Sequence, residues 1–161
     1  MRAVVERVSE ASVLVDGKEV ARIGHGLVVL LAVLTEDALA EAQMMAEKII
    51  GLRIFRGAGG PMDRSVSDEG GSLLVVSQFT LAARLRKGRR PEFTRAARPE
   101  HAEPLVEAFI RHVRERGVPV ASGVFGAMMQ VALVNDGPVT FILDTDALKE
   151  PRRGTPCAGG S

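Results

Sequence analysis

Gly26-Leu27-Val28-Val29-Leu30-Leu31-Ala32-Val33-Leu34 contains the longest uninterrupted apolar run of this 161-residue chain, the eight residues from Leu27 to Leu34. A run of this length is too short for a typical helix, and its richness in Val is typical of a strand that is covered on both faces. We therefore expect residues 27–34 to form the central strand of a sheet, with the rest of the chain arranged around it.

The residues before this strand predict an antiparallel hairpin. Asp16-Gly17 is a favoured sequence for a two-residue hairpin turn, and it lies between the strand-like segments Ser12–Val15 and Lys18–Ile23. Met1–Val8 alternates weakly between apolar and polar residues. The chain is therefore expected to begin with antiparallel strands.

The residues after the central strand predict a helix, a short strand and a loop. Thr35 can cap a helix from Glu36 to about Ile50, whose apolar residues follow the three-and-four spacing of one helix face. Leu52–Phe55 is typical of a short strand. Gly57–Pro61 is expected to be a mobile surface loop, because its glycines and proline favour neither helix nor strand.

Strands and helices continue to alternate in the second half of the chain. The expected elements are a buried strand at Leu73–Phe79, a helix at Pro99–Arg116 that ends at Gly117, and two strands, Met128–Val134 and Val139–Leu143, with Asn135-Asp136-Gly137-Pro138 as a tight turn between them. The sequence has no internal repeat and no linker. It therefore predicts one layered α/β domain, residues 1–144, with two main helices packed on a mixed β-sheet. The tail, residues 145–161, has no periodic pattern and is expected to be flexible.

The composition excludes several classes of protein. Hydrophobic residues make up 46% and charged residues 25%, which is typical of soluble globular domains. The longest apolar run is far shorter than the roughly 20 residues that cross a bilayer, so we expect neither membrane insertion nor secretion. Cys157 is the only cysteine, so the chain can form no internal disulfide. A reducing cytoplasm is the expected compartment.

Positive charge is concentrated in one segment. Arg84–Arg98 holds six Arg and one Lys against the single acid Glu92, so it carries about +6 and leaves about −5 on the rest of a chain whose net charge is +1. A cationic patch on an acidic body would orient a nucleic acid. The alternative is a solvated loop without a partner. The candidate phosphate-binding residues are Arg84, Arg86, Lys87, Arg89 and Arg90.

Few residues indicate side-chain catalysis. Ser77 and Thr80 close a predicted strand, but they lack a G-x-S-x-G motif and an adjacent histidine that could act as a base. Ser77–Thr80 is therefore open to two interpretations, a polar strand end or a site. Gly137-Pro138 is either a plain turn or a special backbone position, since X-Pro bonds are cis in about 5–6% of folded cases.

Metal binding is not indicated by the histidines. His101 and His112 are 11 residues apart on one predicted helix, about 16 Å along its axis, so they cannot share a metal ion. His25 lies between two glycines and has no partner His or Cys at a suitable spacing. We expect neither a metal nor any other cofactor.

Two motifs carry a resemblance to a known family. Ser77-Gln78-Phe79-Thr80-Leu81 and Asn135-Asp136-Gly137-Pro138-Val139-Thr140 closely resemble the D-aminoacyl-tRNA deacylases (the D-tyrosyl-tRNA(Tyr) deacylase family), proofreading enzymes that free tRNA from D-amino acids. The resemblance covers residues 1 to about 144 in collinear order. Its supporting segments are Met1–Val8, Ala11–Val13, Leu52–Phe55, Lys87–Pro91 and Gly123–Gly126.

The resemblance implies a homodimer with its active sites at the subunit interface. Each subunit of such an enzyme inserts the loop that corresponds to Gly137-Pro138, with a cis peptide bond, into the pocket of the other. An L-amino acid side chain then clashes, whereas D-amino acids and glycine, including glycine mischarged on tRNA(Ala), are accepted. Arg7 would brace the loop. Asn135, Val139 and Thr140 belong to the same motif.

The resemblance also implies the catalytic groups. Ser77, Gln78, Phe79 and Thr80 would line the ester, and backbone amides near Phe79 would hold its carbonyl oxygen. The family mechanism is RNA-assisted, with the 2′-hydroxyl of the terminal adenosine helping to activate water, so a covalent role of Thr80 ranks second. Ser77 and Phe79 are typical of the D-specific branch. The segment Arg56–Asp63 departs from the family pattern.

Two other functions remain open from the sequence. The first is a non-catalytic nucleic-acid-binding module that uses the basic segment Arg84–Arg98 on duplex or replication-origin DNA. The second is a metal-dependent hydrolase of small esters, for which His25 and several acids are the only indication.

Overall fold

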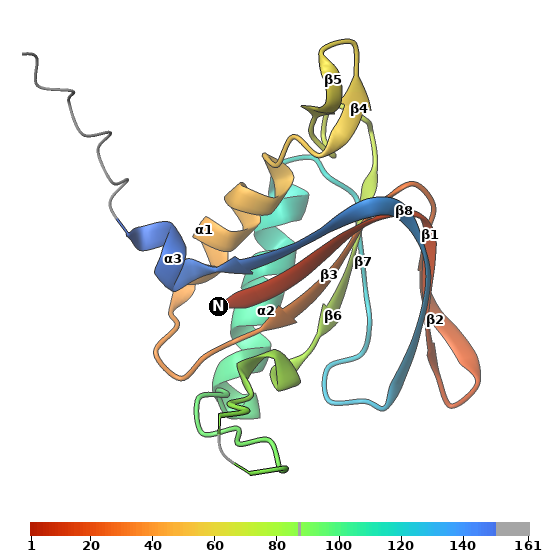
Figure 1. Cartoon of the computed structure of the whole chain (residues 1–161). Coiled ribbons are helices and arrows are strands. Elements are labelled where there is room, and N and C mark those ends of the chain that lie inside the picture. Colours follow the sequence, from red (N-terminus) through yellow and green to blue (C-terminus); the bar gives the residue numbers. More distant parts are fainter. Residues whose placement is uncertain (87, 151–161) are drawn as a thin grey trace, which may run out of the picture.

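The central strand of the sheet is β3 (Gly26–Ala32), as the sequence predicts (Figure 1). It pairs antiparallel with β1 (Arg2–Val15) and parallel with β6 (Ser72–Ser77). The six-stranded sheet has the order β2-β1-β3-β6-β7, and β8 (Met129–Asp144) pairs antiparallel with β1. Strand β1 therefore has partners along both of its edges.

The computed structural model describes residues 1–86 and 88–150. Its other elements are β2 (Lys18–Ile23), α1 (Leu39–Ile50), β4 (Phe55–Gly57), β5 (Gly60–Arg64), the 3-10 helix η1 (Phe79–Ala82), α2 (Pro99–Glu115), β7 (Val120–Ser122) and α3 (Thr145–Lys149). The predicted class, a mixed α/β domain with two main helices, is confirmed. None of the helices in the described residues is long and apolar enough to cross a membrane.

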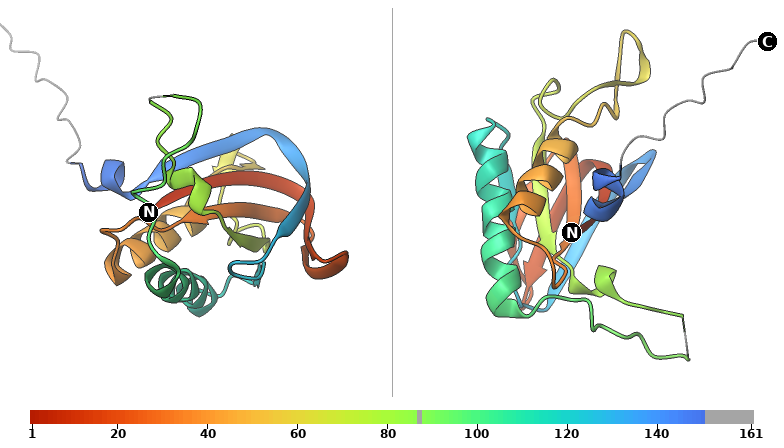
Figure 2. Two further views of the ribbon diagram at one scale, coloured as in Figure 1. Left: turned by 90° about the horizontal axis from the view of Figure 1, so that it is seen from below. Right: turned by 90° about the vertical axis from the view of Figure 1, so that its left-hand side faces the viewer.

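Both faces of β3 are buried, as its apolar run predicts. Leu27 and Val29 belong to the core between the sheet and the helices, and Val28 belongs to a second cluster on the opposite face. Helices α1 and α2 pack together over the first face (Figure 2). The second cluster contains Val8 and Val13 of β1, so the curved sheet covers its own second face. This curvature explains why one sheet needs helices on one side only.

Local signals correctly predicted the β1–β2 turn and the two ends of α2. Asp16 and Gly17 have positive φ angles of 50° and 74°, which the two-residue hairpin turn between β1 and β2 requires. Helix α2 has Pro99 in its first turn, and Gly117 follows its end with a φ of 82°. These positions depend on backbone sterics that residue type alone determines.

Helix α1 begins at Leu39, so the predicted start at Glu36 and the predicted cap at Thr35 are wrong. The reason is a competing turn, in which the Asp37 carboxylate accepts the Leu34 amide at 2.6 Å. The helix is capped instead by Glu41, whose Oε2 accepts the Ala38 amide at 2.7 Å. A carboxylate three residues into the helix can satisfy this amide without a capping hydroxyl.

The loop predicted at Gly57–Pro61 is part of a β-hairpin, β4–β5, that extends from one end of the molecule (Figure 1). The prediction missed the role of Asp63, whose carboxylate accepts the Gly59 amide at 2.9 Å and the Arg53 guanidinium at 2.9 Å. A Cβ at Gly57 would collide with the Asp63 side chain. The glycines therefore make room for an acid that ties the hairpin together. The strand predicted at Leu52–Phe55 begins only at Phe55.

Strand β8 is continuous, so the predicted chain reversal at Asn135–Pro138 is wrong. Glu6 pairs with Thr140 and Val8 pairs with Asn135, so four residues, 136–139, face Arg7 alone. The segment is a bulge, in which extra residues leave one strand while both flanks keep the same antiparallel partner. The polar, Gly and Pro residues of this segment predict that the regular strand pairing is interrupted. They do not distinguish a turn that reverses the chain from a bulge that leaves its direction unchanged. We name residues 135–139 the bulge segment.

The N-terminus meets the start of α3 in a buried polar cluster. The Met1 amino group donates to Asp37 Oδ1 at 2.6 Å and to the Thr145 hydroxyl. Thr145 is the first residue of α3, which lies in the segment that the sequence assigned to the tail; residues 151–161 lie outside the described part. Lys149 Nζ lies 2.6 Å from Glu41 Oε1, and this contact holds the pKa of Glu41 below its usual value.

The Asp37–Met1 ion pair leads to the first prediction, the substitution Asp37→Asn. Both groups are buried, so removing one charge leaves the other without its partner. We expect the free energy of unfolding to fall by about 3 kcal/mol, measured by urea denaturation at pH 7. Glu19→Gln is the control, because it removes an exposed ion pair, with Arg22. Equal losses in the two variants would contradict the prediction.

Candidate active site

A cavity that we name the main cavity lies where β3 and β6 end. Its volume is about 660 Å³, and its wall is formed by the ends of both strands, η1, the first turns of α2 and the segment that leads into β8. Most of its lining is apolar. Its polar side chains are Ser77, Gln78 and Thr80, and no residue that lines it has an ionisable side chain. The cavity can therefore hold an uncharged polar group but offers no side-chain acid or base.

These polar side chains lie at the cavity because strand β6 ends there. It ends at Ser77, two residues before the predicted end, where Ser77 lies beside Leu31 of β3. The Gln78 amide still donates to the Leu31 carbonyl at 2.8 Å, and the chain then turns into η1 with Phe79. The first N–H groups of a helix have no partner inside it. The amides of Phe79 and Thr80, which begin η1 and line the cavity, are therefore left for a ligand, whereas the Leu81 amide donates to the Gln78 carbonyl at 3.2 Å.

Thr80 is not arranged as a nucleophile. The Gln78 side-chain amide donates to Thr80 Oγ1 at 2.5 Å. Nucleophilic activation requires a base that accepts the hydroxyl proton, whereas an amide N–H only donates. The pair therefore orients the Thr80 hydroxyl without making it more reactive.

An exposed aromatic pair lies next to the cavity. The rings of Phe79 and Phe93 meet edge to face with centroids 5.1 Å apart, and Phe79 is 58% exposed. Phe79 was predicted as a site residue, but Phe93 was not. An isolated Phe in the basic segment was the only available sequence signal, and its neighbour became evident only in the fold. Exposed aromatic faces of this kind can stack on nucleobases.

The bulge segment does not reach the cavity of its own chain. It lies opposite Arg7, which pairs with Leu27, whereas the cavity begins at Leu31. Four residues of β3 separate these levels, which corresponds to about 13 Å along the strands. Asn135 to Pro138 are exposed, and the Gly137–Pro138 peptide bond is cis. The fold thus separates the two motifs that the resemblance assigns to one site.

The motif residues around the bulge segment contact one another. Arg7 Nε donates to the Asp136 carbonyl at 3.0 Å and lies 3.1 Å from its carboxylate. Asn135 Nδ2 donates to the carbonyls of Arg7 at 3.1 Å and Val139 at 3.2 Å. Val139 is buried, and the Thr140 hydroxyl donates to Glu6 at 3.3 Å. These contacts form a frame that presents Gly137 and Pro138 to solvent.

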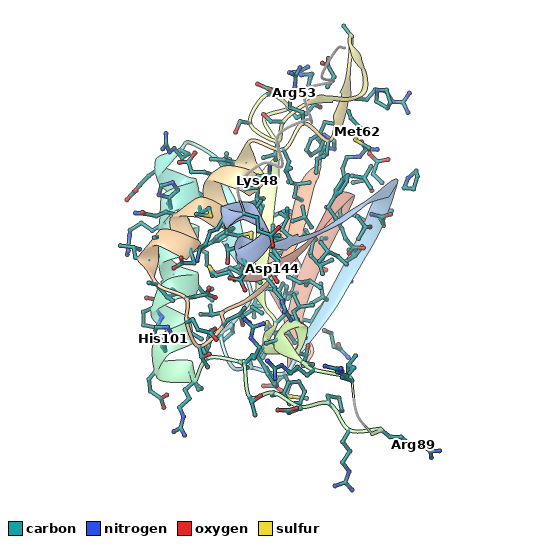
Figure 3. The ribbon with its side chains drawn as sticks, turned by 60° about the vertical axis from the view of Figure 1, so that its left-hand side comes forward. Lys48, Arg53, Met62, Arg89, His101 and Asp144 are labelled. Carbon is teal, nitrogen blue, oxygen red and sulfur yellow. The ribbon has the colours of Figure 1, made fainter. Side chains whose placement is uncertain are left out.

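The basic segment projects from the same end of the molecule as the cavity. It connects η1 with α2, both of which line the cavity, and Arg84 and Glu92 close its base with two backbone hydrogen bonds of 2.8 and 3.1 Å. Figure 3 shows Arg89 at the end opposite Arg53 and Met62 of the hairpin region. Four predicted phosphate-binding residues are exposed, namely Arg84, Arg86, Arg89 and Arg90. Lys87 lies outside the described residues.

Two carboxylates lie in the wall of a cavity next to the main cavity. A smaller cavity of about 150 Å³ shares Ser77 and Phe125 with it and has Glu103 and Glu107 in its wall, which the sequence did not indicate. In the described part of the chain, no three His, Cys, Asp or Glu residues gather in a way that could hold a metal ion. His25 lies 3.4 Å from Glu69, away from the residues that line the main cavity.

Comparison with known proteins identifies relatives along nearly the whole chain. A family model described as D-Tyr-tRNA(Tyr) deacylase matches residues 4–144. The D-aminoacyl-tRNA deacylase of Chloroflexus aurantiacus is 58% identical over 153 residues, which cover 95% of this chain and 96% of that protein. The D-aminoacyl-tRNA deacylase of Thermus aquaticus is 56% identical over 145 residues, which cover 90% and 95%.

Solved structures share the fold. One described as the c-Myc DNA Unwinding Element Binding Protein has a TM-score of 0.85 at 42% identity, covering 89% of this chain and 98% of its own. Another, described as a probable eukaryotic D-amino acid tRNA deacylase, has a TM-score of 0.77 at 21% identity, covering 88% and 97%, and is similar in fold alone. On the family match and these identities, the chain belongs to the D-Tyr-tRNA(Tyr) deacylase family.

Proposed function

We propose that this enzyme hydrolyses the ester of D-aminoacyl-tRNA to free D-amino acid and tRNA, and leaves L-aminoacyl-tRNA intact. Membership of the deacylase family supports the reaction. The structural observation that carries the proposal is the main cavity, whose polar side chains, among the described residues, are those of Ser77, Gln78 and Thr80. Such a cavity can position an ester and its oxyanion, and it has no side-chain base that would make it a general esterase.

The substrate then supplies the base function. In the proposed reaction, water attacks the ester carbonyl carbon, and the terminal ribose of the tRNA assists with its neighbouring hydroxyl. The bond between the carbonyl carbon and the ribose oxygen breaks, and the released ribose oxygen takes a proton. Amides at the start of η1 stabilise the oxyanion. Because an aminoacyl ester is already reactive, positioning and oxyanion stabilisation are enough, and neither a metal nor another cofactor is required.

Rejection of L-amino acids is assigned to a second subunit. The bulge segment lies about 13 Å along the strands from the cavity of its own chain, so it can act on a cavity only when another copy provides it. A two-fold dimer places each copy's segment in the cavity of the other. Gly137-Pro138 would then clash with an L side chain and accept D-amino acids and glycine, including glycine on tRNA(Ala).

We assign binding of the tRNA body to the basic segment. Arg84, Arg86, Arg89 and Arg90 are exposed at the end of the molecule that carries the cavity, where phosphates near the 3′ end can reach them. Phe79 and Phe93 offer aromatic faces for the terminal base. Action in the cytoplasm, where translation uses aminoacyl-tRNA, belongs to the same proposal.

A second candidate function is binding of DNA without catalysis. The observation in its favour is the 42% identity to a protein described as binding a DNA unwinding element. The same exposed arginines could contact the phosphates of a duplex. This function makes no use of the polar strand end at the cavity, so we rank it second.

The deciding prediction concerns substrate selectivity. With a chelator present, we expect the enzyme to hydrolyse D-tyrosyl-tRNA and glycyl-tRNA and to spare L-tyrosyl-tRNA, as measured by loss of the ester at several enzyme concentrations. Survival of all three esters, together with salt-sensitive binding of duplex DNA, would favour the second candidate. Loss of activity on chelation would instead favour a metal-dependent hydrolase.

For tRNA binding we predict the effect of reversing charge at Arg89 and Arg90. The double variant Arg89→Glu and Arg90→Glu should raise KM about tenfold or more and change kcat little, because phosphate contacts stabilise substrate and transition state equally. Lys48→Glu with Arg111→Glu is the matched control, since it makes the same charge change at exposed positions on the two helices. An equal rise of KM in the control would assign the effect to net charge alone.

For catalysis we predict the effect of removing the Thr80 hydroxyl. Thr80→Val should retain kcat within about tenfold of the unsubstituted enzyme, since the hydroxyl only accepts a hydrogen bond from Gln78. Single-turnover hydrolysis of D-tyrosyl-tRNA measures this. A loss of about a thousandfold or more would indicate a covalent role for Thr80.

A further inference from the structure

We propose that Phe55, at the start of β4, is a positioning residue for the bulge segment and so helps to determine discrimination between D- and L-aminoacyl esters. The inference rests on the proposed function and adds a residue that has no contact with the cavity. Phe55 is 80 or more residues from the bulge segment in sequence, and Arg7 connects the two.

Arg7 links three parts of the chain. Its Nε donates to the Asp136 carbonyl at 3.0 Å, and its Nη1 donates to the Ile54 carbonyl at 2.7 Å. Arg7 itself is only 7% exposed. A buried guanidinium is costly unless each of its faces and donors has a partner. The position of Asp136 therefore depends on how firmly the surroundings hold the Arg7 side chain.

Phe55 supplies the partner for the face of this guanidinium. The Arg7 Cζ atom lies 5.9 Å from the centroid of the Phe55 ring, within the range of a cation–π contact. The ring is 1% exposed, and the His25 ring meets it at 5.1 Å and 70°. The ring cannot turn away without opening the core. Arg7 is consequently held by the Ile54 carbonyl at one donor and by the Phe55 ring, over which its Cζ lies.

The bulge segment itself has little freedom to absorb a shift. A Cβ at Gly137 would meet Asn135 Oδ1 at 2.5 Å, and Asn135 holds both sides of the bulge through the carbonyls of Arg7 and Val139. A filter that works by a steric clash requires its atoms to be held to within about 0.5 Å. Loss of the ring under Arg7 would let the guanidinium move and carry Asp136 with it. Acceptance of L-esters should then rise.

The test compares Phe55→Leu with Phe109→Leu. Phe109 is a matched control, because it is a fully buried Phe of the same hydrophobic core but lies on α2. We expect Phe55→Leu to lower the ratio of kcat/KM for D-tyrosyl-tRNA over L-tyrosyl-tRNA about tenfold, mainly through faster loss of the L-ester. Phe109→Leu should reduce stability but keep the ratio. An unchanged ratio in Phe55→Leu, or an equal fall in both variants, would overturn the inference.

Two further variants test the same contact if Phe55→Leu fails to fold. Phe55→Tyr keeps the ring face and should retain the wild-type ratio, whereas Arg7→Lys removes the planar fork and should lower it. The double variant Phe55→Leu with Arg7→Lys should be no less selective than Arg7→Lys alone. The reason is that both changes remove the same contact, the one between the Arg7 guanidinium and the Phe55 ring. Additive losses would contradict a shared contact.

Hydrogen exchange tests the positioning without using activity. The amides of Asn135, Asp136, Gly137 and Val139 should exchange about tenfold faster in Phe55→Leu than in Phe109→Leu at equal global stability. If the unsubstituted enzyme cleaves none of the esters, the proposed function fails while this measurement still decides the positioning role. If the enzyme is selective and exchange in Phe55→Leu equals that of the control, the positioning role alone fails.

Discussion

The double pairing of β1 is the constraint on which the rest of this structure depends. β1 pairs with β2 and β3 along one edge and with β8 along the other, so its register determines where every neighbouring residue lies. The bulge segment faces Arg7 because of this register, and the cavity begins four residues away along β3 for the same reason. A slip of one residue would reverse the inside and outside of both strands. The two motifs of the family are thus held apart by the ladder.

Because of this separation, the two ends of the sheet carry different features. One end of the sheet carries a cavity without ionisable side chains, and the other end carries a rigid, exposed peptide held by Arg7 and Asn135. In the function we propose, both ends are needed to distinguish mirror-image substrates. Chemistry that relies on positioning and on the reactivity of the ester is compatible with a site of this kind. Under the proposed selection by exclusion, no side chain would be needed to recognise the amino acid itself.

The distribution of charge follows the same geometry. The basic segment connects η1 with α2, so it lies at the end of the molecule that carries the cavity, while the rest of the chain is net acidic. A polyanion approaching this protein is therefore attracted to one end and repelled elsewhere. Elsewhere on the described surface, basic side chains pair with acids of the same chain, as Arg22 does with Glu19 and Arg116 with Glu47.

The sequence by itself determined the elements whose signals are local. Residues 27–34 predicted the central strand, Asp16-Gly17 the first hairpin, and Pro99 with Gly117 the bounds of α2, because burial pattern and backbone sterics act within a few residues. The motif Ser77–Thr80 and the basic segment were likewise evident. Tertiary structure decided the features that depend on partners remote in sequence. Asp37 accepts both the Leu34 amide, in the turn that delays the start of α1, and the remote Met1 amino group. Residues 136–139 form a bulge because β1 pairs with both of their flanks. Phe93 meets Phe79, and Phe55 meets Arg7, only in the folded chain. No local pattern encodes such contacts, since the free energy that selects them arises from packing between segments that the chain brings together on folding.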